Sequence, residues 1–460
     1  MYNRVMNMNE VENNRAAYTA RKEALIQEMR SVQAGEGVRL SKDTSNLFRD
    51  YKVEAKRKLN VRDFNHVLEV NAKEGWIEVE GMTTYYDLVK AALAKNVMPA
   101  VVPQLRSITI GGAISGVGIE ASSFRYGLVH ETVQEMDVAL GKGEVVTATP
   151  ANEHSDLFFG LPNSYGSLGY VLKVKVKAVP VKKYVHVQHI RFTSYTALVD
   201  GIKTYEHYTS IDFLDGVVFS PQEMYLSLGV FVDEAPYTSD YTYKKIYYKS
   251  IKERSDDYLT THDYIWRWDT DWFWCSQALY MENPIIRRIM GRERLNSVTY
   301  TKIMRWNQKW NISKRMEALL GKQTESVIQD VAIPLDALDE FLQFYEQEID
   351  IRPIWVCPSR PFNKEHTFPL FPLKATTTYV DVGFWGGKQV PKGTPDGLIN
   401  RKLEDKVQEL NGVKSLYSSV YFDEDTFWSI YNGTQYNHLK QKYDPTNKRP
   451  NLYQVVTTRT

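Results

Sequence analysis

A dense group of glycines between residues 111 and 118 constrains the fold of this 460-residue chain more than any other feature. Gly111, Gly112, Gly116 and Gly118 follow one another too closely for an ordinary helix or strand, so we expect a loop. Glycine permits positive φ angles and lets backbone N–H groups approach a ligand closely, as in loops that hold pyrophosphate. The spacing is neither GxGxxG nor that of a P-loop. A glycine-rich turn that binds nothing is the alternative that composition alone favours.

The bulk composition excludes several classes of protein. A formal net charge of +1 argues against a general nucleic-acid binder, which needs a clear basic excess. Cys275 and Cys357 are far apart, so we expect no disulfide framework and no metal site. The N-terminus is polar, and no apolar run approaches the ~18 residues that a membrane span requires. We therefore expect a cytoplasmic protein, or one bound to the inner face of the cell membrane.

Apolar residues recur with both the helical and the strand period, which indicates an α+β fold. Helical spacing covers residues 16–30, with Leu25, Ile26 and Met29 as a narrow apolar stripe, and residues 84–94. The expected strands are residues 38–40, 67–70, 76–79, a hairpin over 133–149, 170–179, 216–220, 225–230, 327–333 and 377–384.

Four segments, in order, resemble the vanillyl-alcohol-oxidase superfamily, whose FAD-binding domain is of the PCMH type. They are residues 76–88, the run from Pro103 to Gly127, residues 156–170 with DLF and GSLG, and KYDP at residues 442–445. The resemblance implies an FAD-binding PCMH-type domain of two subdomains over residues 1–184. A substrate (cap) domain with an antiparallel sheet would follow over residues 185–425, and residues 426–460 would return to the flavin domain.

Further motifs resemble two reductase branches of this superfamily. One branch, the delta-24 sterol reductases, is similar to this chain at residues 117–123, 148–150 and 180–184. The other branch consists of bacterial FAD-binding oxidoreductases that make 10-methyl-branched fatty acids of the tuberculostearic acid type. It is similar to this chain at residues 102–105, 158–166, 262–275 and 382–385. The resemblance implies reduction of a lipid carbon–carbon double bond with NADPH as electron donor. The lipid would be a methylene-branched phospholipid acyl chain or a sterol-like side chain, and a lipid methyltransferase would be a partner.

The resemblance also implies which residues bind FAD, and that no covalent bond holds it, because residues 37–46 contain neither His nor Cys. Ser41, Lys42, Thr44 and Ser45 would supply hydroxyl donors and a positive charge to the pyrophosphate, although a polar turn is an equal reading. The other expected FAD-binding residues are Pro103, Thr109, Gly111, Gly112, Gly116, Gly118, Ile119, Glu120, Ser122, Ser123, Tyr126, Gly127, Gly166, Leu168 and Gly169.

The catalytic acid is harder to identify from the sequence. Residues 261–275 interleave four tryptophans with charged residues, which fits an aromatic core with Arg–Asp pairs or a pocket wall bearing His262 or Arg267. Tyr417, Lys442 and Tyr443 are further candidates by position. His130, a lone histidine after the glycines, is expected to be structural. Two rival functions stay open: an oxidase or dehydrogenase of an alcohol or sugar, and a lipid-binding flavoprotein without turnover.

A basic segment extends from Arg287 to Arg315, with nine basic residues and one acidic residue, Glu293. Ile303, Trp306 and Trp310 would share one face of a helix there. Such a segment fits association with an anionic membrane surface, and a solvated basic helix is equally compatible with it.

Overall fold

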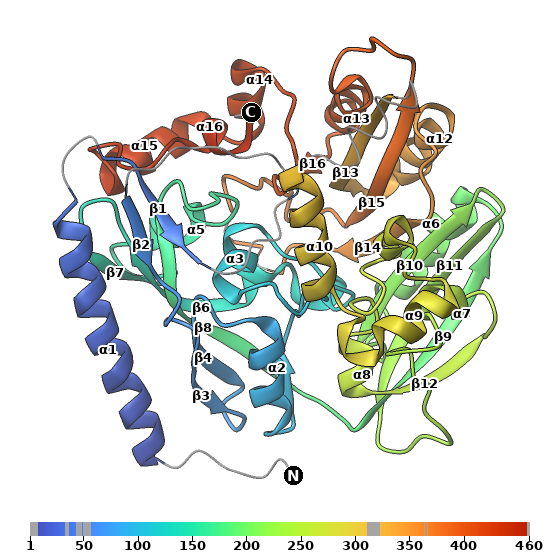
Figure 1. Cartoon of the computed structure of the whole chain (residues 1–460), viewed down its shortest axis with the longest axis horizontal. Coiled ribbons are helices and arrows are strands. Elements are labelled where there is room, and N and C mark those ends of the chain that lie inside the picture. The colour runs from blue at the N-terminus through green and yellow to red at the C-terminus, as the bar shows by residue number, and fades with distance from the viewer. Residues whose placement is uncertain are drawn as a thin grey trace.

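The structure is a computed structural model that describes residues 8–32, 36–42, 48, 57–310, 323–362, 364–365 and 367–457. Two antiparallel sheets, of six and eight strands, form the frame of the molecule, and helices cover them (Figure 1). The expected α+β fold is confirmed. The division of the first part into two subdomains stays a prediction.

The six-stranded sheet and the helices beside it form the N-terminal unit. Its strands are β3 (Val67–Asn71), β4 (Trp76–Glu80), β5 (Val97–Pro99), β6 (Val133–Ala139), β7 (Val145–Ala148) and β8 (Tyr170–Pro180). The order is β3-β4-β8-β6-β7, with β5 paired to β8. The short helices of this unit are α2 (Tyr85–Leu93), α3 (Ile110–Ser115), α4 (Ser123–Tyr126) and α5 (Ser155–Gly160). A separate parallel pair joins β1 (Val38–Ser41) to β2 (Arg57–Asn60).

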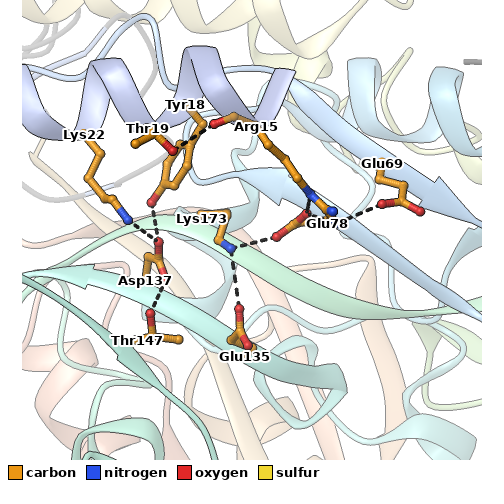
Figure 2. Close-up of polar contacts among 10 residues, drawn as sticks. All are labelled: Arg15, Tyr18, Thr19, Lys22, Glu69, Glu78, Glu135, Asp137, Thr147 and Lys173. Carbon is orange, nitrogen blue, oxygen red and sulfur yellow. Dashed lines mark hydrogen bonds and ion pairs between the residues drawn. The ribbon is translucent and has the colours of Figure 1, made fainter. Parts of the chain in front are cut away.

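Helix α1 (Met8–Arg30) is longer than the predicted helix and lies against this sheet through polar contacts (Figure 2) and a buried apolar cluster. The Tyr18 hydroxyl donates to Asp137 Oδ2 at 2.6 Å, and Arg15 forms an ion pair with Glu78 at 2.8 Å. Lys173 on β8 bridges to Glu78 at 2.7 Å. Leu25 and Met29 of the predicted apolar stripe are buried, whereas Ile26 is only half-buried. The stripe alone is therefore too narrow to account for the docking of this helix.

The eight-stranded sheet forms the second unit, in the order β12-β9-β11-β10-β14-β15-β13-β16. One face of this sheet packs against α6, α12 and α13. The other face looks toward the N-terminal unit, as members of the larger core cluster such as Ala332 and Trp355 indicate. The bounds are β9 (Tyr184–Phe192), β10 (Phe213–Ser220), β11 (Glu223–Val232), β12 (Asp256–Thr260), β13 (Gln323–Pro334), β14 (Ile354–Ser359), β15 (Tyr379–Val390), β16 (Val413–Lys414), α6 (Tyr195–Tyr205), α12 (Leu338–Glu348) and α13 (Leu398–Glu409).

The last helices lie over the N-terminal unit, next to β1 and α5 in Figure 1. They are α14 (Glu424–Ile430), α15 (Gly433–Tyr443) and α16 (Leu452–Thr457). Lys440 Nζ donates to the carbonyl of Ser167 at 2.9 Å, and Arg449 Nη2 donates to the carbonyl of Ala139 at 3.1 Å. A buried lysine and a buried arginine thus join the tail to the first sheet.

Candidate functional site

A cavity of about 660 Å³ lies between the two units, a size usual for a ligand site. Its walls come from β1, α3 and the start of β8 on one side, and from the eight-stranded sheet on the other. Residues of the C-terminal tail, Pro450 and Val455, complete the lining. One continuous space therefore touches both units and the tail.

The glycine-rich segment forms one wall, but the prediction of a loop is wrong for its first part. Gly111 and Gly112 lie in helix α3, whose N-cap Thr109 accepts a hydrogen bond from the Gly112 N–H at 3.3 Å. None of the four glycines has a positive φ; that conformation falls on Val117, at 52°. The glycines are instead required by close packing, because the Cβ of any larger residue at Gly118 would lie 2.9 Å from Pro103.

Gly112 differs from its neighbours because it faces the cavity. A Cβ added there would meet Thr109 Oγ1 at 2.9 Å and nothing else within 4 Å. A larger side chain at Gly112 would therefore occupy the cavity itself, whereas at Gly111 it would collide with the backbone of Gly81. This open backbone surface is what close approach of a flat or phosphorylated ligand needs.

Basic side chains gather at one end of the cavity. Ser41 and Lys42, expected at the pyrophosphate, line it together with Arg39, Lys58 and Arg62. Thr44 and Ser45 lie outside the described residues. Cations and hydroxyl donors of this kind bind phosphate oxygens through charge-assisted hydrogen bonds. The glycine wall and this basic end thus fit a dinucleotide such as FAD.

The other expected FAD-binding residues divide into two groups. Those that line the cavity are Pro103, Thr109, Gly111, Gly112, Gly116, Gly118, Ile119 and Gly166. Those outside its lining are Glu120, Ser122, Ser123, Tyr126, Gly127, Leu168 and Gly169. Local structure engages several of the second group: the Ser122 hydroxyl donates to the carbonyl of Ala100, and Leu168 is fully buried in the core. A sequence motif marks the segment but does not show which of its side chains face inward.

Arg267, expected as a catalytic group, lies in a buried network outside the cavity lining. Its Nη2 donates to Asp215 Oδ2 at 2.9 Å and to Glu120 Oε1 at 3.3 Å. Trp268 and Trp355 donate their indole N–H groups to the same Asp215 oxygen. Burial raises the pKa of Glu120 to about 8, so Asp215 supplies the charge that balances Arg267. The positive charge of Arg267 therefore has a buried counter-charge, which indicates a structural role for this cluster.

Three other candidate acids also lie away from the cavity. His262 is exposed on α8 (Thr261–Ile265) beside Asp263. Lys442 and Tyr443 both contact Asp156 of α5, at 2.7 Å and 2.6 Å, and so join α15 to the first unit. His130 is buried against Phe368, where burial lowers its pKa to about 3 and keeps the ring neutral. These positions give none of the three candidates access to a ligand in the cavity.

Aromatic rings line a second region of the cavity wall, called the aromatic end. Trp272 and Phe273 reach it from the tryptophan-rich segment, and Trp355 and Trp385 reach it from β14 and β15. Residues 272–274 have three consecutive positive φ angles, 50°, 49° and 57°, a conformation that costs free energy in non-glycine residues. The surrounding packing holds this turn, with the rings of Phe273 and Trp385 4.9 Å apart. The segment is therefore part pocket wall and part core, because its other tryptophans, Trp266, Trp268 and Trp274, are buried.

Tyr417, predicted from position, lines this aromatic end and accepts a hydrogen bond from Trp385 Nε1 at 2.8 Å. Beside it lies Asp330 on β13, which the sequence analysis missed. Burial and the neighbouring carboxyl group of Asp381 raise the pKa of Asp330 well above its usual range. Strand alternation could have revealed this residue, because Asp330 shares a face with the apolar Ile328 and Ala332 on either side of it.

Comparisons with known proteins agree with this geometry. Residues 22–149 match the family model described as "FAD binding domain". The "Delta(24)-sterol reductase" of Homo sapiens is 27% identical over 413 residues, covering 85% of this chain and 76% of that protein. The protein of the same name from Arabidopsis thaliana is 26% identical over 442 residues, covering 86% and 75%.

A shorter similarity is confined to part of the chain. "Cytokinin dehydrogenase 10" of Oryza sativa subsp. japonica is 29% identical over 129 residues, 28% of this chain and 23% of that protein. The similarity to sterol reductases extends through the eight-stranded sheet, whereas this one does not. The expected resemblance to FAD-binding oxidoreductases of the sterol-reductase type is confirmed.

Proposed function

We propose that this chain, which carries an FAD-binding domain and resembles delta(24)-sterol reductases along most of its length, reduces a carbon–carbon double bond in a lipid. The favoured substrate is a methylene-branched acyl chain of a phospholipid, with a sterol-like side chain as the second possibility. NADPH is the proposed electron donor, on the strength of the resemblance. Such an acyl substrate is the product of one-carbon transfer to an unsaturated lipid, so a lipid methyltransferase is the proposed preceding enzyme.

The observation that carries this proposal is that one cavity combines two kinds of lining. Its glycines and basic side chains suit FAD, and the rings of Trp272, Phe273, Trp355 and Trp385 supply an apolar surface. Rings that pack against an apolar chain exclude water from a reacting carbon and hold it in place. These rings would offer the hydroxyl groups of a sugar or a small alcohol few hydrogen-bond partners, because the indole N–H groups of Trp355 and Trp385 already donate to Asp215 and Tyr417.

When bound, FAD would supply the hydride chemistry, with the nicotinamide as the source of electrons. The chain's own share would be to bind and orient. Ser41, Lys42 and Arg39 line the cavity and would bind the phosphates, and Gly112 leaves room for the cofactor against α3. The aromatic rings would hold the apolar substrate and exclude water.

The direct experiment incubates the holoenzyme with methylene-phospholipid vesicles and NADPH in the absence of air. We expect the acyl mass to increase by that of two hydrogens. An unchanged acyl mass, with rapid peroxide formation from a sugar or alcohol in air, would establish the rival oxidase function. An unchanged mass with bound FAD and no turnover of either substrate class would establish a lipid-binding flavoprotein.

We also propose that FAD is held without a covalent bond. Cys275 lines the cavity, but burial raises its pKa to about 12, so it stays a protonated and unreactive thiol. Acid should therefore release the yellow flavin, and Gly112→Val should purify with little FAD. Ala151→Val, which adds bulk at an exposed position of the same unit, should retain it. Flavin that stays on the chain in denaturing electrophoresis contradicts the proposal, as does a normal FAD content of Gly112→Val.

We propose that the protein reaches such a substrate through a surface formed by α9 (Pro284–Met290) and α10 (Ser297–Trp310). We call this surface the α9–α10 face. Ile285 and Ile289 are 70% and 73% exposed on α9, and Trp306 and Trp310 are 59% and 52% exposed on α10. Each pair is spaced four residues apart and so lies on one side of its helix. Both helices lie toward the viewer in Figure 1.

The charge around these apolar residues favours an anionic bilayer as the occupant. Arg288, Arg294 and Lys302 are exposed beside them. Arg287, expected to contribute, does not: it is buried and pairs with Asp271 at 2.5 Å. The predicted helical face is also divided, because Ile303 packs inward with Tyr300 against Trp272, which lines the cavity. No helix in the described part of the chain is long and apolar enough to cross a membrane.

The test is sedimentation with vesicles of phosphatidylglycerol and phosphatidylcholine at low and high salt. The triple variant Arg288→Gln, Arg294→Gln, Lys302→Gln should lose up to ~1 kcal/mol of binding free energy per cation. The charge-matched control Lys73→Gln, Lys90→Gln, Lys392→Gln changes three exposed lysines outside α9 and α10 and should bind as the wild type does. Equal binding by both variants would leave α10 as a solvated basic helix.

A further inference from the structure

Asp330 places a carboxyl group in the wall of the cavity. It is half-buried because one side faces the cavity, and its Oδ1 accepts no hydrogen bond from the described residues. No salt bridge to Asp330 occurs in the part of the chain that the structure describes. A buried carboxyl group without such a partner costs free energy, so its presence calls for a role.

The surroundings of Asp330 fix its position and favour its neutral form. Gly383 on β15 lies opposite it, and a Cβ at Gly383 would come within 2.7 Å of Asp330 Oδ1. Asp381, two residues earlier on β15, is buried and lacks a partner for Oδ2 among the described residues. The other groups that face Asp330 are the Tyr417 hydroxyl and the Cys275 thiol, neither of which carries positive charge. Two carboxyl groups this close cannot both ionise readily, so the pair retains a proton at neutral pH.

We infer that Asp330 is the catalytic acid that protonates the substrate double bond, an inference that rests on the proposed reductase function. An isolated alkene resists hydride addition unless the other carbon accepts a proton. The required acid must carry a proton, reach the cavity and lie among groups that tolerate positive charge. Among the residues placed along the aromatic end, Asp330 meets all three conditions.

The step balances in atoms and charge. The Asp330 O–H bond breaks and its proton bonds to the terminal carbon of a methylene group, which leaves a tertiary carbocation and an Asp330 carboxylate. The faces of Trp355, Trp385 and Phe273 stabilise the cation by cation–π attraction. The cationic carbon then takes the hydride that the reduced cofactor supplies, and Asp330 recovers a proton from water. One hydrogen of the product comes from the carboxyl group and one from the hydride donor.

The experiment separates the two half-reactions of the holoenzyme. Asp330→Asn keeps the shape of the side chain and removes its proton, so FAD content and reduction by NADPH should match the wild type. Oxidation of the reduced enzyme by methylene-phospholipid vesicles should slow by on the order of 10²–10⁴-fold, the usual contribution of a general acid. Asp405→Asn, which alters an exposed aspartate of the same unit, is the control.

A measurement that does not depend on turnover distinguishes loss of the proton from a purely structural effect of the substitution. The infrared difference spectrum between the wild type and Asp330→Asn, recorded on the protein without cofactor at neutral pH, should contain the carbonyl band of a protonated carboxyl group. A second variant, Asp381→Asn, removes a neighbouring negative charge, so the alkaline limb of the oxidation rate should move to lower pH.

The outcomes distinguish this inference from the proposed function. If the wild type fails to transfer electrons to the alkene, the reductase function is wrong. If the wild type succeeds and Asp330→Asn oxidises at the same rate, Asp330 is not the acid. Absence of the protonated carboxyl band, or an unshifted pH limb in Asp381→Asn, would equally overturn the inference.

Discussion

The Arg267 cluster and the Asp330–Asp381 pair are two buried groups of charged residues on the same eight-stranded sheet, and they are built oppositely. In the first, Arg267 lies 2.9 Å from Asp215 and donates to Glu120 as a second acceptor, so a cation and its counter-charge are paired. In the second, two carboxyl groups approach each other and no cation in the described residues joins them. The first group lies outside the cavity lining, whereas Asp330 of the second lies in it.

The difference shows how structural and functional charge can be distinguished. A matched buried group stabilises only the fold around it, and removing one member leaves the others uncompensated. An unmatched group destabilises the fold and is retained when chemistry requires it. Stability and activity should therefore respond in opposite ways to changes in these two regions.

The largest effect is expected from Arg267→Met. It leaves Asp215 buried without its cation, so the free energy of unfolding should fall by about 3–5 kcal/mol. The matched control is Arg292→Met, which breaks the exposed pair with Asp240 and should cost about 0–1 kcal/mol. Urea denaturation of both variants measures the difference. Equal losses would show that the buried network contributes no more than a surface pair.

Asp381→Asn should do the reverse and stabilise the protein at neutral pH. Burial raises the pKa of Asp381 to about 7 from an ordinary value of 3.8, so the folded state holds this proton more tightly than the unfolded state. The contribution of Asp381 to stability is therefore present below about pH 4 and is lost as pH rises to about 7. Ionisation of Asp381 lowers the free energy of unfolding by at most about 4 kcal/mol, and the variant removes this loss.

Urea denaturation at about pH 5 and about pH 8 tests this difference. The advantage of Asp381→Asn over the wild type should be larger at the higher pH, and Asp405→Asn should show none. A variant less stable than the wild type at both values would mean that the Asp381 carboxyl group is compensated after all.

The smallest effect is expected from Tyr417→Phe. The Tyr417 hydroxyl beside Asp330 lowers the pKa of that carboxyl group, so its removal should raise the pKa further. The alkaline limb of the lipid-reduction rate should therefore move to higher pH. Asp381→Asn should move the same limb in the opposite direction. If the limb moves in the same direction in both variants, it does not report the ionisation of Asp330.

The sequence predicted the frame of the molecule better than its interior. Period-2 alternation located the strands around residues 170–179 and 327–333, because each has one face toward a core. The glycine-rich segment is predicted to be a loop that approaches a ligand; its glycines line the cavity, yet helix α3 within it is not expected from the sequence. Glycine composition argues for a loop, whereas the Thr109 cap and close packing against Gly81 stabilise a short helix.

The catalytic candidates were the weakest prediction, for a physical reason. Arg267 and Asp330 both look unusual in an apolar context, and only tertiary packing shows which of them has a partner. Asp215 lies 52 residues from Arg267 in the sequence, so no local pattern reveals their pairing. The exposure of Trp306 and the burial of Arg287 depend in the same way on how α9 and α10 pack.

The most direct test of the account follows the flavin of the reduced holoenzyme after rapid mixing without air. With methylene-phospholipid vesicles, the absorbance of oxidised flavin should return in step with a gain of two hydrogens in the acyl chain. Oxygen-saturated buffer without lipid should restore it much more slowly. Flavin that stays reduced with the alkene lipid but is rapidly reoxidised by oxygen would contradict the proposed reduction of a lipid double bond.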